Sequence, residues 1–270
     1  MSTVFTNVAS PKHVFPDHPE SPDRFSLLLP RLDSFGAQKL DVTPAAKDEI
    51  ARVHLPGLIE SLEEICRQGP AIIDPAPTFV TRTSFEDALL AAGGTLVCTR
   101  AVLTGDAKNA FALIRPPGHH ASASSAWGFC YFNNMAITLE RLKAKGKINK
   151  AFLLDFDLHF GDGNVNILSS KGYVTILNPD SSSRLEYLKN VEKALARTDA
   201  DLIAVSAGFD NHEEDWGGLL KTEDYTRMGR LVRETALRNK GGCFGILEGG
   251  YNHAVLGKNV KAFINGLQAP

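Results

Sequence analysis

Four short segments of this chain combine histidine, aspartate and tyrosine, side chains that bind metals, move protons and donate hydrogen bonds in enzymes. They are residues 115–120 (RPPGHH), 155–159 (DFDLH), 206–210 (SAGFD) and 248–251 (EGGY). Each motif alone has a high chance rate. If the four meet in space, they supply metal ligands, a histidine pair and a phenol, which together indicate a metal-dependent hydrolase.

Asp157, His159 and Asp210 are the predicted metal ligands. Residues two apart in an extended chain point to the same side, so Asp157 and His159 can present an oxygen and a nitrogen to one ion. Three protein ligands and an open position are typical of catalytic zinc, whereas a structural site closes with four ligands. Iron(II) is compatible with the same ligands. Each residue alone could be a solvated carboxylate or a turn histidine, but their clustering favours the metal site.

His119 and His120 follow a stiff Pro-Pro-Gly bend and form the predicted proton-transfer pair. Adjacent imidazoles with different partners can have pKa values pushed apart, as acid and base roles require. Asp155 and Asp162 are the predicted carboxylates that orient the two rings, although either could be a loop cap. Tyr251 could donate its phenol to an oxyanion.

Short apolar strands precede these polar segments along the chain. We expect strands at residues 111–114, 151–154, 202–205 and 243–247, and helices that start at 84, span 134–144 and 186–196, and follow 222. Apolar strands that alternate with helices indicate a parallel sheet covered on both faces. Ligands bind beyond the carboxyl ends of the strands in such sheets, so the four segments can meet at one edge.

Two helix starts carry specific predictions. Ser84, with Asp87 three residues later, fits a capping box, and Thr222 is the expected N-cap of the last predicted helix. Gly93 and Gly94 weaken the first of these helices unless another element packs closely against them.

The 270 residues suit one large α/β domain, which we expect to span residues 1–270. Lys and Arg total 29 against 31 Asp and Glu, with no long like-charge run, so we expect neither a nucleic-acid partner nor a membrane-binding face. The four cysteines lie far apart without a C-x-x-C pair. We therefore expect a cytoplasmic protein, whose oligomeric state the sequence leaves open.

The chain resembles the histone deacetylase superfamily, which includes acetoin-utilisation proteins and acetylpolyamine amidohydrolases. The resemblance rests on six segments: HPE at 18–20 with Arg24, RPPGHH at 115–120, GFCYFNN at 128–134, DFDLHFGDG at 155–163, SAGFD at 206–210 and EGGY at 248–251. It implies a single α/β domain of the arginase-deacetylase type. It also implies removal of an acyl group, with acetyl favoured, from acyl-lysine in a peptide or protein or from an acylated polyamine.

The resemblance gives the candidate residues the same roles: zinc binding at Asp157, His159 and Asp210; proton handling at His119 and His120, backed by Asp155 and Asp162; and polarisation of the substrate carbonyl at Tyr251. It adds Gly128 and Phe129 as lining of an acyl-lysine channel. It further implies a potassium ion (K⁺) held by main-chain oxygens around Asp155, Asp157 and His159.

The chain departs from the family pattern at two places on the rim of the expected channel. Residues 176–184 are short where relatives carry a long loop with a second aromatic wall, so we predict a more open pocket that accepts bulkier acyl groups or different amines. The usual Asp-Pro-Leu-Gly is replaced by Asp-Trp-Gly-Gly at 215–218. Trp216 is then either a substrate contact or a surface anchor.

Two other functions fit parts of the sequence. The surplus carboxylates Asp155 and Asp162 suit an arginase-like ureohydrolase with two manganese ions, which requires a binuclear site. A catalytically silent binder of acylated ligands is the second, although the intact set of ligands, histidines and tyrosine argues against it.

Overall fold

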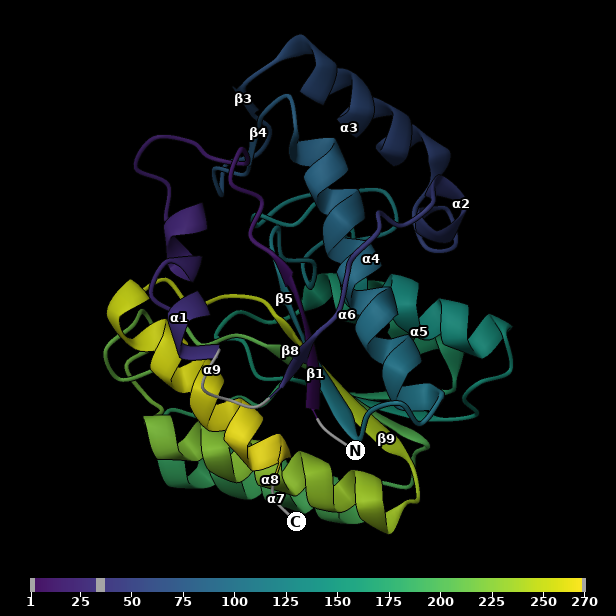
Figure 1. Cartoon of the computed structure of the whole chain (residues 1–270), viewed down its shortest axis with the longest axis vertical. Helices are drawn as coiled ribbons and strands as arrows, with labels where there is room; N and C mark the ends of the chain where they lie inside the picture. Colours follow the sequence, from purple (N-terminus) through teal and green to yellow (C-terminus); the bar gives the residue numbers. More distant parts are fainter. Residues whose placement is uncertain (1–2, 33–36, 269–270) are drawn as a thin grey trace.

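A seven-stranded sheet forms the centre of the computed structural model, which describes residues 3–32 and 37–268 (Figure 1). Its strands pair in the order β2-β1-β5-β9-β8-β6-β7, and every pairing is parallel. The strands are β1 (Thr3–Val8), β2 (Gln38–Lys39), β5 (Asn109–Ile114), β6 (Ala151–Asp155), β7 (Val174–Leu177), β8 (Leu202–Ala207) and β9 (Gly242–Leu247). A separate antiparallel pair joins β3 (Ala71–Ile72) to β4 (Phe79–Val80).

Helices cover both faces of this sheet. They are α1 (Leu29–Leu32), α2 (Lys47–Ile50), α3 (Pro56–Gln68), α4 (Ser84–Leu103), α5 (Asn134–Ala144), α6 (Asp162–Leu168), α7 (Arg184–Arg197), α8 (Thr222–Arg238) and α9 (His253–Leu267), with short 3-10 turns at Pro22–Phe25 and Ser169–Lys171. One buried apolar cluster lies between the sheet and α3, α4 and α5, and a second lies between the sheet and α7, α8 and α9. Figure 1 shows these two helical layers on opposite sides of the strands. The predicted α/β fold, a parallel sheet flanked by helices, is confirmed.

Both predicted N-caps are wrong by one residue. Ser84 is the first residue of α4 and Thr83 is its N-cap, because the Ser84 hydroxyl instead accepts a hydrogen bond from the Thr81 N–H (2.7 Å). Thr222 likewise lies inside α8, where its hydroxyl donates to Asn259 Oδ1 (2.8 Å), and Lys221 is the N-cap. In both cases the hydroxyl that would cap the helix forms a hydrogen bond elsewhere: that of Ser84 to the preceding turn, and that of Thr222 to a residue of α9.

The two glycines of α4 mark close approaches to other elements. A Cβ atom on Gly93 would lie 1.9 Å from the main-chain oxygen of Thr43, and one on Gly94 would lie 3.2 Å from Ile114 Cγ2 in β5. The residues before α2 therefore cross α4 at Gly93, and the helix presses on the sheet at Gly94. The prediction that another element packs against this pair is confirmed.

A buried charge network ties the amino-terminal segment to the loop after β9. The Glu20 carboxylate accepts hydrogen bonds from Arg115 Nε (2.6 Å) and Arg24 Nη1 (3.1 Å). Burial opposes the charge of Glu20, but the two guanidinium groups outweigh it and lower its pKa to about 2. Arg24 also donates to the main-chain oxygens of Glu248 (2.6 Å) and Gly250 (2.8 Å). The network thus holds the loop that carries Tyr251.

Candidate active site

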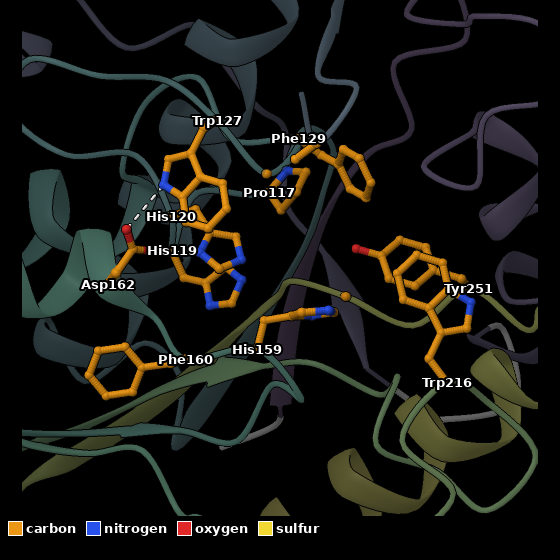
Figure 2. A pocket seen from close by; sticks show the side chains of 13 residues that line it. Pro117, His119, His120, Trp127, Phe129, His159, Phe160, Asp162, Trp216 and Tyr251 are labelled. Atoms are coloured by element: carbon orange, nitrogen blue, oxygen red, sulfur yellow. Dashed lines mark hydrogen bonds and ion pairs between the residues drawn. The ribbon is translucent and has the colours of Figure 1, made fainter. Parts of the chain in front are cut away.

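The four motif segments follow the carboxyl ends of β5, β9, β8 and β6, which are neighbours in the sheet. They surround a pocket of about 530 Å³, drawn in Figure 2. Seven predicted site residues line it: His119, His120, Gly128, Phe129, His159, Asp162 and Tyr251. The other three, Asp155, Asp157 and Asp210, are buried carboxylates next to it. The fold therefore brings all ten residues to one edge of the sheet.

Asp157, His159 and Asp210 form a group that could hold a metal ion, because their ligand atoms all lie within 4.8 Å of one another. His159 Nδ1 lies 3.2 Å from Asp157 Oδ1 and 3.1 Å from Asp210 Oδ2. Both carboxylates are buried, and within the described residues Asp210 Oδ2 makes no polar contact that adds to the one with His159. Two buried carboxylate oxygens that converge on one point require positive charge there, so the donor set fits a divalent cation.

The pKa shifts of Asp157, His159 and Asp210 also indicate that negative charge is crowded at this point. Hydrogen bonds to Asp157 and Asp210 raise the pKa of His159 to about 10. Burial opposes the charge of Asp157, but His119 and His159 outweigh it and hold the pKa of that carboxyl below its usual range. Burial and the nearby charge of Asp157 raise the pKa of Asp210 to about 6. Crowded carboxylates of this kind are stabilised by a cation placed between them.

Each imidazole of the histidine pair contacts its own carboxylate, as predicted. His120 Nδ1 lies 2.6 Å from Asp162 Oδ1, and His119 Nδ1 lies 3.4 Å from Asp155 Oδ2. His119 Nε2 is also 3.8 Å from Asp157 Oδ1, and the two imidazole rings are in tilted contact, with their centroids 4.0 Å apart. His119 is therefore the inner ring, between two buried carboxylates, and His120 is the outer ring beside the pocket.

This placement moves the two pKa values in opposite directions. Burial disfavours the charge of His119, but Asp157 and Asp155 outweigh it and raise its pKa well above 6.5. Burial, followed by the charge of His119, lowers the pKa of His120. The two imidazoles thus have opposite electrostatic surroundings, which is the pattern of an acid and base pair.

Three polar residues without a role in our sequence analysis hold Asp155 in place. Asn164 Nδ2 donates to Asp155 Oδ2 (2.9 Å) and to Ser206 Oγ (3.2 Å), and Ser206 in turn donates to Glu248 Oε1 (3.1 Å). Ser206 and Glu248 belong to motif segments, but Asn164 was missed. The one sequence signal for Asn164 is its polar side chain at a position of the short helix α6 that is buried. A buried polar side chain requires a hydrogen-bond partner, which here is Asp155.

A second group of metal-binding residue types, His119, Cys130 and Glu248, also lies within 4.8 Å. Its groups are already engaged: Glu248 Oε2 accepts hydrogen bonds from the main-chain N–H groups of Gly118 (2.8 Å) and His119 (3.3 Å). Burial and the charge of Glu248 raise the pKa of the Cys130 thiol well above its usual value. This group therefore stabilises the loop at 118–120.

Tyr251 reaches the pocket from the loop after β9. Its ring stacks on Trp216 with the centroids 4.1 Å apart, and the Arg24 guanidinium lies 5.1 Å from the ring centroid. Asp215 Oδ2 accepts the main-chain N–H of Tyr251 (2.8 Å), which fixes the backbone. Burial raises the pKa of the phenol well above 10, so it stays a neutral donor. Figure 2 shows its hydroxyl directed into the space between Phe129 and His159.

Gly128 and Phe129 form the wall of the pocket opposite Trp216, as Figure 2 shows for the aromatic side chains. Both have positive φ values, 58° and 69°. A Cβ on Gly128 would lie 2.5 Å from His120 Cδ2, so only glycine fits against that ring. Phe129 is held in its strained conformation by a hydrogen bond from its N–H to Thr78 Oγ1 (2.8 Å).

Residues 176–184 contribute nothing to the described lining of the pocket. The rim is formed instead by Phe160 and Trp216, which are 60% and 52% exposed. The His159 side chain is itself 43% exposed. Trp216 both lines the pocket and packs on Tyr251, and the more open pocket expected from the short segment stays a prediction.

A parallel α/β fold with an Asp-His-Asp group and two histidine–carboxylate pairs beyond its strand ends is the pattern of a metallohydrolase. The family model described as "Histone deacetylase domain" matches residues 18–179 and 174–267. A probable deacetylase of Archaeoglobus fulgidus is 32% identical over 88% of this chain and 77% of its own length. The chain therefore belongs to the histone deacetylase family, which confirms the predicted class, a deacetylase of the hydrolase type.

Two further similarities cover different lengths of the chain. The solved structure of the HDA15 HD domain covers 99% of this chain and 91% of its own, with a TM-score of 0.85 and 25% identity. A human protein named "Polyamine deacetylase HDAC10" is 35% identical over 159 residues, which are 53% of this chain and 23% of that protein.

Within the described ranges, no helix has the length and apolar character to cross a bilayer.

Proposed function

We propose that this chain is a metal-dependent amidohydrolase that removes an acyl group, with acetyl favoured, from acyl-lysine or from an acylated polyamine. The observation that carries the proposal is the convergence of Asp157, His159 and Asp210 beside two imidazoles whose pKa values are displaced in opposite directions. The polyamine class is supported by the name of the human relative. Residues 1–270 as one domain remain part of this proposal.

Asp157, His159 and Asp210 would hold the ion, with zinc favoured and iron(II) compatible with the same oxygen and nitrogen donors. The ion supplies Lewis-acid chemistry, because it polarises a carbonyl oxygen and makes water more acidic. The potassium ion implied by the family resemblance stays a prediction.

The chain's own residues divide the proton transfers between them. His120 takes the proton of the attacking water at Nε2, because its Nδ1 is bonded to Asp162. His119 keeps its proton and presents positive charge beneath the reacting atoms. His120 then passes the proton it took from water to the nitrogen of the departing amine, so that the C–N bond breaks and the amine leaves neutral.

Tyr251 donates its phenol to the oxygen of the attacked carbonyl, where negative charge develops. Phe129 and Trp216 would flank the acyl chain from the two sides of the pocket. Because residues 176–184 do not line the pocket, we expect acyl groups larger than acetyl to fit as well.

Among the described residues, the contacts of Asp155 and Asp162 give no support to the binuclear alternative. Asp155 Oδ2 accepts a hydrogen bond from Asn164 and lies near His119, and Asp162 contacts His120 and Trp127. The two carboxylates that suggested a second manganese ion thus orient imidazoles.

Purified protein loaded with zinc or iron(II) should be assayed against acyl-lysine peptides of graded acyl length and against acylated polyamines, with the metal content measured in parallel. We expect hydrolysis of at least one class with one metal per chain, and loss of activity after chelation. Two metals per chain would favour the ureohydrolase. Full metal loading without turnover on any substrate would favour the silent binder.

A further inference from the structure

Trp127 contacts both members of the outer histidine–carboxylate pair. Its indole Nε1–H donates to Asp162 Oδ2 (3.1 Å), while Asp162 Oδ1 lies 2.6 Å from His120 Nδ1. Its ring also contacts the His120 ring in a tilted arrangement, with the centroids 4.4 Å apart and an angle of 41° between the planes. Figure 2 shows His120 between Trp127 and His119, with the hydrogen bond to Asp162 at the edge of the pocket.

The main chain around Trp127 is pinned, so these contacts are built into the loop. The Trp127 carbonyl accepts the N–H of Cys130 (3.0 Å), which closes a tight turn through Gly128. Gly128 lies so close to the His120 ring that there is no room for a Cβ atom at this position. The main chain that carries the indole is therefore fixed next to His120.

Asp162 needs such a partner because its side chain is 31% exposed. A carboxylate at the mouth of a pocket can rotate and exchange its hydrogen bonds with water. A tryptophan is a donor only, so it can bind one carboxylate oxygen and leave the other to accept from the imidazole. The hydrogen bonds of Trp127 and His120 to the two carboxylate oxygens therefore both restrict rotation of the Asp162 carboxylate.

We propose that Trp127 is a positioning residue for proton transfer: its indole N–H holds the Asp162 carboxylate in the orientation that aligns His120. The inference rests on the proposed function, since it assigns the outer pair to the reaction. Trp127 itself donates no proton to the substrate. It acts through Asp162 by fixing where the free nitrogen of His120 points.

A double-mutant cycle tests this role. Trp127→Phe keeps an aromatic ring over His120 and removes the donor, and it should lower kcat about 3-fold to 10-fold with a smaller change in KM. The decrease is moderate because water can reach the exposed Asp162 oxygen. In an Asp162→Asn background the same substitution should change kcat by less than about 2-fold, because its target is already altered.

Trp216→Phe is the matched control, since it makes the same substitution on the opposite rim without touching Asp162. Its effect on kcat, whatever its size, should be the same in the wild-type and Asp162→Asn backgrounds. If Trp127→Phe also combines additively with Asp162→Asn, or leaves kcat unchanged, Trp127 is only a wall of the pocket and the proposal is wrong.

A spectroscopic measurement separates this inference from the proposed function. The chain has two tryptophans, so its ¹H–¹⁵N spectrum contains two indole signals, which Trp127→Phe and Trp216→Phe assign. Asp162→Asn should shift the Trp127 signal and leave the Trp216 signal in place. An unmoved Trp127 signal in a folded Asp162→Asn protein overturns the inference, even if the substrate panel finds activity. A shifted signal without any turnover supports the contact and contradicts the proposed function.

Discussion

At the scale of single residues, two adjacent and chemically identical side chains have opposite electrostatic surroundings. Burial disfavours charge on both, but His119 lies between the carboxylates of Asp155 and Asp157, whereas His120 has one partly exposed carboxylate and a charged neighbour ring. The sequence pair alone is symmetric. The difference in pKa arises from the charged groups that each ring meets in the fold.

Tyr251→Phe should lower turnover by about 10²-fold or more, because it removes one oxyanion donor. Metal content should stay close to that of the wild type, since the phenol is not among the predicted ligands. Steady-state kinetics and metal analysis of the same preparation check both statements. Tyr225→Phe is the control, because it removes a buried tyrosine hydroxyl that bonds to the Phe209 carbonyl outside the pocket. Unchanged turnover in Tyr251→Phe would contradict the assigned role.

At the scale of elements, the loop before α5 is fastened by a buried histidine. His54 Nδ1 donates to the Ser122 carbonyl (2.9 Å), and Nε2 accepts the N–H of Asn133 (2.9 Å). Asn133 is also the N-cap of α5. The ring must be neutral to make both bonds, and burial lowers its pKa to about 4.

This shift predicts a pH-dependent contribution of His54 to stability. The folded-state pKa of about 4 is below the ordinary value of 6.5, so the unfolded chain binds the extra proton first between these values. The contribution is therefore complete above pH 6.5 and is lost as the pH falls toward 4, by roughly 2–3 kcal/mol between pH 7.5 and 4.5. His54→Gln keeps a donor and an acceptor without titrating. Urea unfolding at both pH values should show the wild-type advantage over this variant shrinking; an advantage constant with pH would refute the prediction.

The crossing at Gly93 predicts that a better helix former destabilises α4. Gly93→Ala should lower the free energy of unfolding by roughly 2 kcal/mol or more, because the new methyl meets a main-chain oxygen at 1.9 Å and outweighs the ~1 kcal/mol gain in helix propensity. Gly57→Ala in α3 is the matched control, since nothing lies within 4 Å of its Cβ position and the variant should be neutral or more stable. Denaturant unfolding of both proteins checks the pair. Equal effects of the two substitutions would show that α4 does not pack as described.

At the scale of the whole molecule, the two ends of the chain are interleaved in one sheet. β1 pairs with β5 from the middle of the sequence, and β9, near the carboxyl end, lies between β5 and β8. Arg24 bonds to the loop after β9. No strand near either end can leave without exposing the edge of a central strand.

We therefore expect residues 1–270 to unfold in a single cooperative transition. The two tryptophans, Trp127 and Trp216, report on the pocket by fluorescence, while far-UV circular dichroism reports on the helices of both layers. The two urea curves should coincide within error. Separate midpoints would indicate two domains and contradict the prediction of one.

Four strands, four helices and the candidate residues could be predicted from the sequence, because each depends on a local pattern. Four apolar runs became β5, β6, β8 and β9, and α5 has the predicted bounds. Parallel α/β sheets place the ends of such strands at one edge, so the polar segments after them could be expected to meet. The sequence by itself thus determined which residues gather and in which type of fold.

Only the tertiary structure decided how these residues are partnered. The strand order that sets β9 between β5 and β8, the N-caps one residue from their expected positions, and the contacts of Asn164 and Trp127 all join residues far apart in the chain. The opposite pKa shifts of His119 and His120 likewise depend on burial and on distances to carboxylates from other strands. Local sequence patterns carry no information on these distances, because the distances are fixed only when the strands pair and the helices pack against the sheet.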